Sequence, residues 1–365
     1  MEKLVKSYIL DECNKLIDRH HDYLHNLNEF INRKSKRYGS PIKKDILIPK
    51  YWEIYKGFNP FQVKSKKLLD LFAYTLAERL KSGNYKPQTA IKHLVPKLGG
   101  GKRELNIFPI PDASVSRLIY KSLLEKNVNR FSSYAYAYRE ERSAHDAILR
   151  IAYDWRTKNR VYVAEFDFSK FFDRIQHSYL WNILNNQGFL FTDLEQNVLN
   201  AFLNSNSSDP STYQPHSGTK RDRGIPQGTS VSLFLANVAC WELDHEMERI
   251  GVRFARYADD TLVWSNSYER IVQAYDAIEY FSRLMGVPIN FEKSEGITII
   301  SERDSEELKS KPKVVFLGYE VSLKHVSVSA KNVKTIKEKI SSIINENLLQ
   351  PIRQGVFNSA RLSTL

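Results

Sequence analysis

The sequence has little cysteine and no long hydrophobic run. Its 365 residues contain only Cys13 and Cys240, which lack the spacing of a cysteine metal site and favour a reducing cytosol. No stretch of about 18 apolar residues is present, and residues 1–6 lack the apolar core of a signal peptide. We therefore expect a cytoplasmic protein with no membrane-spanning segment.

Acidic residues are the minority among the charged ones. The chain has 54 Lys and Arg against 42 Asp and Glu, which gives a formal charge of +12 and a pI of about 9.4. This balance suits a polyanionic partner, most commonly nucleic acid, although an acidic membrane surface fits the charge equally well. With 19 Phe, 20 Tyr and 42% apolar residues, the chain can bury a sizeable core in two or three domains or lobes.

The most informative stretch is the segment Arg256-Tyr257-Ala258-Asp259-Asp260. Residues 252–255 and 261–264 flank it and are rich in β-branched and aromatic side chains, so the pattern predicts a β-hairpin with both acids at its turn. A solvated hairpin tip is one interpretation, because Asp tolerates tight turns. The other is a divalent-cation site, since carboxylates suit Mg²⁺. A further carboxylate from elsewhere would favour the second.

Asp167 is that further carboxylate. It follows residues 161–166, an apolar segment typical of a central strand. If both strands belong to one sheet, their acids lie at the same rim, where two metal ions about 4 Å apart can clamp the attacking and leaving oxygens of a displacement. The alternative is that Asp167 caps a helix beginning within residues 168–174.

The remaining pattern is that of a basic, mostly helical chain. Residues 1–50 form a charged helical extension, and residues 94–107 form two strands around a glycine turn that carries Lys102 and Arg103. That hairpin either grips phosphate or is simply exposed. We also expect a helix over 113–127 capped by Asp112, a polar loop over 204–223, one long helix from about 230 to Gly251, and a basic amphipathic helix over 330–348.

Four blocks then occur in a fixed order: Glu165-Phe166-Asp167-Phe168-Ser169-Lys170-Phe171-Phe172-Asp173, Gly224-Ile225-Pro226-Gln227-Gly228, Tyr257-Ala258-Asp259-Asp260 and Phe316-Leu317-Gly318-Tyr319. Together they resemble the successive motifs of reverse transcriptases, above all the bacterial and group II intron types. The resemblance covers about residues 95 to 322. It implies an α+β right-hand polymerase fold with fingers, an antiparallel-sheet palm and a short, mostly helical thumb.

The resemblance also implies a division of the chain. Residues 1–60 would be the helical basic extension, 61–160 the fingers and 161–323 the palm, with 183–223 returning toward the fingers. Residues 324–365 would be the thumb, either incomplete or completed by a partner protein or a second protomer.

The implied activity is RNA-directed DNA polymerisation, in which dNTPs are added to a primer 3′-hydroxyl on an RNA template. By resemblance, Asp167, Asp259 and Asp260 are catalytic and hold two Mg²⁺ ions, which Mn²⁺ can replace, with Phe168 beside the metals. Lys293 matches the lysine that protonates the leaving pyrophosphate, although a surface lysine is an equal alternative.

The same resemblance assigns the nucleotide-binding residues. Lys102 and Arg103 match the fingers hairpin that holds the triphosphate, and the incoming nucleotide is placed against a second set: Phe168, Phe172, Gln227 and Gly228. Phe172, five residues after Asp167, matches the steric gate that excludes a 2′-hydroxyl, whereas the alternative is a core phenylalanine. Residues 316–319 match the primer grip, or else form a plain core hairpin.

The subtype is read from the N-terminal extension, the length and the divergent residues 133–139. These features look most like the abortive-infection and defence-associated reverse transcriptases of bacteria, which implies a bacterial cytoplasm, a dedicated noncoding RNA template and antiphage defence. The primer is left open between an RNA end, a DNA end and a protein hydroxyl. Two other functions are also open: a template-independent nucleotidyl transferase on the same palm, and a non-catalytic RNA-binding scaffold.

Overall fold

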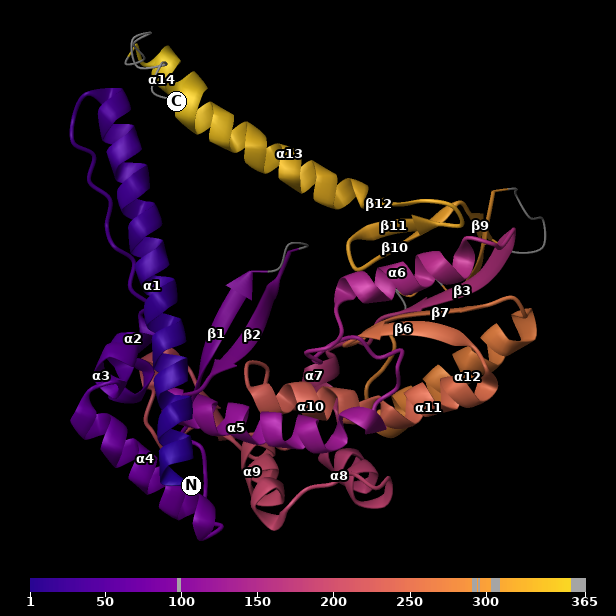
Figure 1. Cartoon of the computed structure of the whole chain (residues 1–365), viewed down its shortest axis with the longest axis horizontal. Coiled ribbons are helices and arrows are strands. Elements are labelled where there is room, and N and C mark those ends of the chain that lie inside the picture. Colours follow the sequence, from indigo (N-terminus) through magenta and orange to yellow (C-terminus); the bar gives the residue numbers. More distant parts are fainter. Residues whose placement is uncertain (97–99, 291–293, 295, 303–308, 356–365) are drawn as a thin grey trace.

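The computed structural model describes residues 1–96, 100–290, 294, 296–302 and 309–355. It is an α+β structure in which a long N-terminal helix stands at one side, a sheet with helices on both faces at the other, and a C-terminal helix reaches back between them (Figure 1). In the described part of the chain, no helix combines the length and the apolar character needed to cross a membrane.

The helices, in chain order, are α1 (Glu2–Tyr38), α2 (Tyr51–Ile54), α3 (Pro60–Val63), α4 (Lys66–Lys81), α5 (Ile110–Asn127), α6 (Ala144–Trp155), α7 (Phe171–Arg174), α8 (His177–Asn186), α9 (Asp193–Leu203), α10 (Ser230–Ala239), α11 (Trp241–Ile250), α12 (Tyr268–Met285), α13 (Ala330–Ile344) and α14 (Gln350–Arg353). A π-helical turn, Asn345–Leu349, joins the last two.

The strands are β1 (Ala90–Pro96), β2 (Lys102–Ile107), β3 (Arg160–Phe166), β4 (Asn206–Ser208), β5 (Thr219–Lys220), β6 (Arg253–Tyr257), β7 (Asp260–Ser265), β8 (Gly296–Ser301), β9 (Ser310–Lys311), β10 (Lys313–Phe316), β11 (Tyr319–Ser322) and β12 (Val326–Val328). They form three sheets, with the orders β6-β7-β3-β8-β9, β2-β1-β4-β5 and β10-β11-β12.

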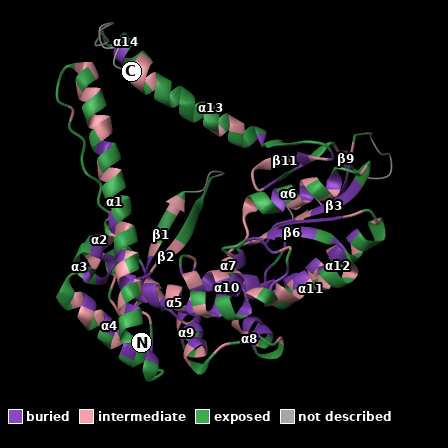
Figure 2. Ribbon diagram, in the orientation of Figure 1, coloured by how far each residue is buried: buried purple, intermediate pink, exposed green. Residues whose placement is uncertain are grey.

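The five-stranded sheet separates two hydrophobic cores, because side chains alternate across each strand. On β3, Val161 and Val163 face the core formed with α6 and the β10-β11-β12 sheet. Tyr162, Ala164 and Phe166 face the larger core, which includes residues of α10, α11 and α12. Figure 2 shows buried residues on both sides of this sheet. β3 is therefore held from two sides, which fixes the position of the residue that follows it.

The N-terminal helix α1 joins the larger core along its first half. Val5, Ile9 and Cys13 are buried in the larger core, and α1 contacts α4 and α5 there. Its distal half extends away and meets the C-terminal helices, where Arg37 Nη1 donates to Asn347 Oδ1 at 2.5 Å (Figure 1). The expected helix over residues 1–50 ends at Tyr38, because Gly39 adopts the left-handed conformation typical of a helix end.

Three further expectations about local structure are corrected. Helix α5 begins at Ile110 rather than 113, since Pro109 and Pro111 suit the start of a helix. Asp112 is therefore inside the first turn rather than a cap; it is buried and accepts from the Tyr85 hydroxyl at 2.8 Å, and burial raises its pKa to about 7.

The expected long helix after residue 229 is two helices, because the backbone leaves the helical conformation at Cys240 (φ −94°, ψ 2°) between α10 and α11. The polar segment 204–223 is not all loop: β4 pairs in parallel with β1, and β5 pairs with β4.

Candidate active site

The hairpin turn carrying Asp259 and Asp260 is formed as expected. β6 and β7 pair antiparallel up to Tyr257 opposite Asp260, so the turn consists of Ala258 and Asp259. Ala258 has φ 60°, a left-handed conformation that costs a residue with a side chain about 1–2 kcal/mol. The strain implies that surrounding contacts hold this turn in place.

Arg256 supplies those contacts. Its side chain is completely buried, its Nε and Nη2 donate to both carboxylate oxygens of Asp244 at 2.7 and 2.6 Å, and its Nη1 donates to the carbonyl of Ala258 at 3.2 Å and to Asn237 Oδ1 at 3.2 Å. Although burial opposes the charge, Asp244 raises the pKa of Arg256 above its usual value. This ion pair fixes the hairpin turn to α10 and α11.

Asp167 lies at the same end of the sheet as the hairpin turn. β3 pairs antiparallel with β7 up to Phe166 opposite Thr261, so the next residue on each strand is Asp167 or Asp260. Asp167 is nearly buried, and its Oδ2 accepts from the Asn290 side chain at 3.4 Å. Its backbone N–H donates to Ser294 Oγ at 3.3 Å. The helix-cap alternative for Asp167 is wrong, because α7 begins only at Phe171.

Asp259 is half-buried at the turn and lies near Tyr138. Burial, and next to it the Asp259 carboxylate, raise the pKa of the Tyr138 phenol to about 12. A phenol that stays protonated can remain beside a carboxylate without adding charge to it. The sequence patterns had assigned no role to Tyr138, Arg256 or Asn290. The one available signal was an arginine at an inward-facing position of an apolar strand.

The three acids offer the hard oxygen donors that Mg²⁺ prefers. Among the residues that the structure describes, no three His, Cys, Asp or Glu side chains form a group that could hold a metal ion. Mg²⁺ does not require such a cage, because it keeps several waters and is bound through one or two carboxylates together with substrate phosphates. The donor chemistry therefore fits an ion brought in with a nucleotide.

Phe172 and the block Gly224–Gly228 are bound to each other. The N–H of Ile225 donates to the carbonyl of Phe172 at 2.6 Å. Gly224 has φ 74°, and a Cβ there would lie 2.6 Å from the Asp173 carbonyl and 2.7 Å from that of Phe172. Only glycine permits this approach. The Phe172 ring is half-buried and packs edge-on against Phe171, with 5.7 Å between centroids.

Gln227 and Gly228 connect this block to the β1–β2 hairpin. The Gln227 side chain donates to Asp173 Oδ1 at 3.2 Å, and its carbonyl accepts from the N–H of Asn106 at 2.6 Å. Gly228 approaches the Asn106 carbonyl so closely that a Cβ would lie 2.7 Å from it. Asn106 is on β2, so the block is fixed to the base of the hairpin.

Lys102 and Arg103 are exposed at the start of β2, and β2 pairs with β1 as expected, with Val95 opposite Arg103. Phe168 is different: its ring is buried and stacks on Phe171, which leaves only its backbone for a ligand. Lys293 lies outside the described residues.

Residues 316–319 form the β10–β11 turn, where Leu317 has φ 48° and the Tyr319 hydroxyl lies 2.9 Å from His145 Nε2.

The chain is similar to several known proteins. It is 28% identical to protein YkfC of Escherichia coli K12 over 59% of this chain and 54% of YkfC. It is 31% identical to the retron Ec86 reverse transcriptase of E. coli over 33% of this chain and 35% of that enzyme. It thus spans about half the length of YkfC. Telomerase from Candida albicans, solved with a fragment of telomeric RNA, aligns with TM-score 0.49 and 14% identity over 74% of this chain and 50% of telomerase.

One family model covers most of the molecule described above. The model named "Reverse transcriptase (RNA-dependent DNA polymerase)" matches residues 95–321. That range contains β2 with the end of β1, β3 with Asp167, the Gly224–Gly228 block and the β6–β7 turn. The chain therefore belongs to the reverse transcriptase family.

Proposed function

We propose that this chain is an RNA-directed DNA polymerase that adds deoxynucleotides to a primer 3′-hydroxyl opposite an RNA template. The observation that carries the proposal is the strand register that brings Asp167 to the same end of the sheet as Asp259 and Asp260. Family membership supports it, because the match includes both strands.

In this proposal Asp167, Asp259 and Asp260 hold two divalent ions, Mg²⁺ in the first instance. When bound, such ions lower the pKa of the primer hydroxyl and neutralise charge on the reacting phosphates. The chain's own contribution is to keep the three carboxylates in register. Arg256 holds the turn that carries Asp259, and Asn290 orients the Asp167 carboxylate.

The remaining residues bind and select the nucleotide. Lys102 and Arg103 neutralise the triphosphate from the fingers side, as exposed cations on a hairpin can do. Phe172 excludes a 2′-hydroxyl from the space beside Asp167, while Gln227 and Gly228 line the sugar and base. Gly224 packs tightly on the carbonyls of Phe172 and Asp173. This packing supports the role because it fixes the position of the Phe172 backbone.

The test is primer extension on an RNA template with dNTPs and Mg²⁺. We expect Asp259→Asn to abolish extension, with a loss of at least about 10³-fold, because a metal-binding carboxylate becomes neutral. Asp276→Asn, on the exposed face of α12, is the matched control and should extend normally. Extension that survives Asp259→Asn would contradict the proposal.

The product sequence separates the alternatives. Complementarity to the supplied RNA supports templated synthesis, whereas a product unrelated to it would indicate template-independent transfer. RNA binding without nucleotide incorporation by the unmodified chain would indicate a scaffold. A dedicated noncoding RNA, antiphage defence and completion of the thumb by a partner or second protomer stay predictions from the resemblance.

A further inference from the structure

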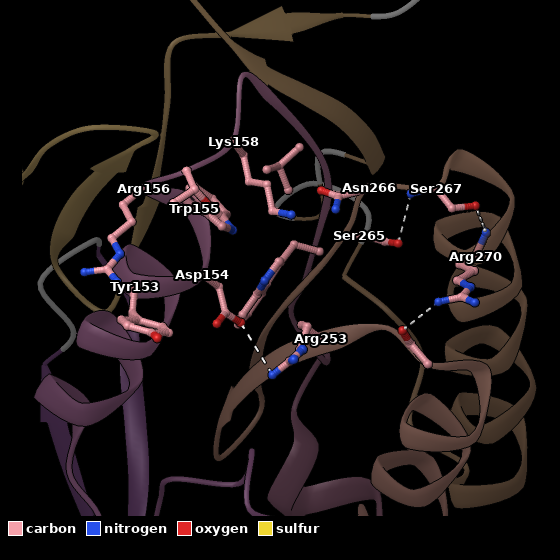
Figure 3. Close-up of a pocket in the computed structure, with 14 residues that line it drawn as sticks. Tyr153, Asp154, Trp155, Arg156, Lys158, Arg253, Ser265, Asn266, Ser267 and Arg270 are labelled. Atoms are coloured by element: carbon pink, nitrogen blue, oxygen red, sulfur yellow. Dashed lines mark hydrogen bonds and ion pairs between the residues drawn. The ribbon is translucent and has the colours of Figure 1, made fainter.

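A second surface of the sheet has the features of a ligand site. Two adjoining cavities of about 530 and 880 Å³ lie along the outer side of α6, and both are lined by Tyr153 and Arg156. The smaller one lies between the end of α6, the end of β7 and the start of α12 (Figure 3). We call the two together the α6 groove. Its smaller cavity lies at the start of β3, and the strand runs about 20 Å from there to Asp167, whereas the larger cavity reaches Tyr136 and the start of α6.

Positive charge predominates in the α6 groove. Seven of its lining residues are cationic: Arg142, Arg150, Arg156, Lys158, Arg253, Arg270 and Lys324. The two acids that line it are already engaged. Asp154 lies 3.4 Å from Arg150 and 3.9 Å from Arg253, and Asp146 accepts from the N–H and hydroxyl of Ser143 in the capping box of α6. The groove therefore favours an anion, and its length favours one with several charges.

Aromatic rings alternate with these cations. Arg142 lies over Tyr136 at 5.6 Å, Arg150 over Tyr134 at 5.8 Å and Arg156 over Tyr153 at 4.4 Å. Tyr153 is 59% exposed, and Leu149, one helical turn earlier, is 67% exposed. An exposed ring beside an arginine is the arrangement on which unpaired bases stack in proteins that bind single strands.

Two buried indoles form part of the smaller cavity. Trp155 and Trp264 are almost fully buried, with ring centroids 6.3 Å apart and planes at 84°. Within the described residues, neither Nε1 has a hydrogen-bond acceptor. In Figure 3, Trp155, Lys158 and Arg253 point toward the same space, next to the N-terminus of α12. Buried donors without partners are costly, but both N–H atoms are covered by protein, so the cations and the exposed tyrosine make the ligand contacts.

We propose that the α6 groove binds a single-stranded segment of nucleic acid, separately from the polymerase centre. Phosphates would pair with the cations, and a base would stack on Tyr153. A mononucleotide would fill only one of the two cavities. A duplex hides its base faces, so it could not use the exposed tyrosine.

The test uses the full chain carrying Asp259→Asn, so that it is independent of catalysis. The probe is a 20-nucleotide oligo(U) containing 5-iodouridine, which on irradiation couples to aromatic side chains that it touches. Coupled positions are then identified by mass spectrometry. We expect coupling at Tyr153, and Arg156→Glu should lower its yield by about tenfold because one phosphate partner is reversed in charge.

The matched control is the Tyr280–Arg283 pair on α12. Its tyrosine is 58% exposed, and its arginine follows after the same spacing. Arg283→Glu should leave coupling at Tyr153 unchanged. The proposal would be overturned if UMP competed with oligo(U) when both were present at the same concentration. It would also be overturned if no coupling occurred at Tyr153. Primer extension measured in Arg156→Glu with Asp259 intact should remain normal, which distinguishes failure at the groove from failure at the active site.

Discussion

The two ends of strand β3 differ in charge, packing and contacts. At its C-terminal end, Asp167 lies beside the turn that carries Asp259 and Asp260, and close backbone contacts fix neighbouring segments to one another. At its N-terminal end, exposed cations surround open space on the outer side of α6. The comparison teaches that one sheet can present a rigid acidic site and an adaptable basic surface. Each prediction below therefore pairs a change at one end with a matched change at the other.

The largest effect is expected at Arg256. Replacing it in Arg256→Met leaves Asp244 buried without its partner, which costs about 3–5 kcal/mol in the free energy of unfolding. Arg253, three residues earlier on β6, is half-exposed, so Arg253→Ala should change that free energy by less than about 0.5 kcal/mol. Urea denaturation of both variants measures the difference. Equal losses of unfolding free energy in the two variants would mean that the Arg256 ion pair stabilises the fold no more than Arg253 does.

Replacing a glycine by alanine should cost more stability at the active-site end of β3 than at the α6 groove, because the backbone is packed more closely there. Gly224→Ala meets the Asp173 and Phe172 carbonyls at 2.6–2.7 Å, so we expect a loss of at least about 2 kcal/mol and slower primer extension. Gly251→Ala, near the α6 groove, has a similar positive φ but meets only the Arg270 side chain at 3.3 Å. Its cost should be about 1 kcal/mol. Thermal denaturation, followed by extension assays, checks both values.

Aromatic residues at the two ends should differ in function rather than stability. Phe172→Ala should admit ribonucleotides, lowering the preference for dNTPs over NTPs by roughly tenfold or more, since a pocket that loses bulk no longer excludes the hydroxyl. Tyr153→Ala is the counterpart in the α6 groove and should leave that ratio unchanged. The measurement is the ratio of kcat/KM for a dNTP and its ribonucleotide. Unchanged sugar selection in Phe172→Ala would remove the gate assignment.

The smallest effect concerns salt. For the unmodified chain, oligo(U) binding should weaken steeply with ionic strength because phosphate contacts release counterions. Arg156→Ala should reduce the slope of log Kd against log salt by about one, whereas Arg283→Ala should not change it. Fluorescence anisotropy between 50 and 200 mM salt, roughly the range over which such binding varies strongly, gives both slopes. Identical slopes would show that Arg156 makes no phosphate contact.

Local patterns were enough to predict the strands that carry the acids. β3, β6 and β7 are short, β-branched and aromatic, and each borders an aspartate, so their meeting at one rim followed from pairing in a single sheet. The order of four motifs then supplied the family, and residues 95–321 match it. The placement of each substrate-binding residue around a nucleotide stays a prediction.

What the pattern could not supply were contacts between distant segments. The Arg256–Asp244 ion pair depends on where α11 lies, and that in turn depends on the helix break at Cys240, which an uninterrupted apolar periodicity conceals. The early start of α5 depends on Pro109 and Pro111 rather than on a polar cap. The α6 groove joins residues from several separate stretches of the chain, so no local motif marks it.

Strand β3 carries a restriction on chain length as well as on composition. Its odd-numbered valines belong to one core and its even-numbered aromatic residues to the other. Inserting or deleting a single residue between Val161 and Phe166 would exchange the two sets and turn the following carboxylate to the opposite side. Natural variation in length can therefore be accommodated before Arg160 but not within the strand. A designer who grafts this centre onto another sheet must keep the number of residues in the strand, so that each side chain stays on its own face.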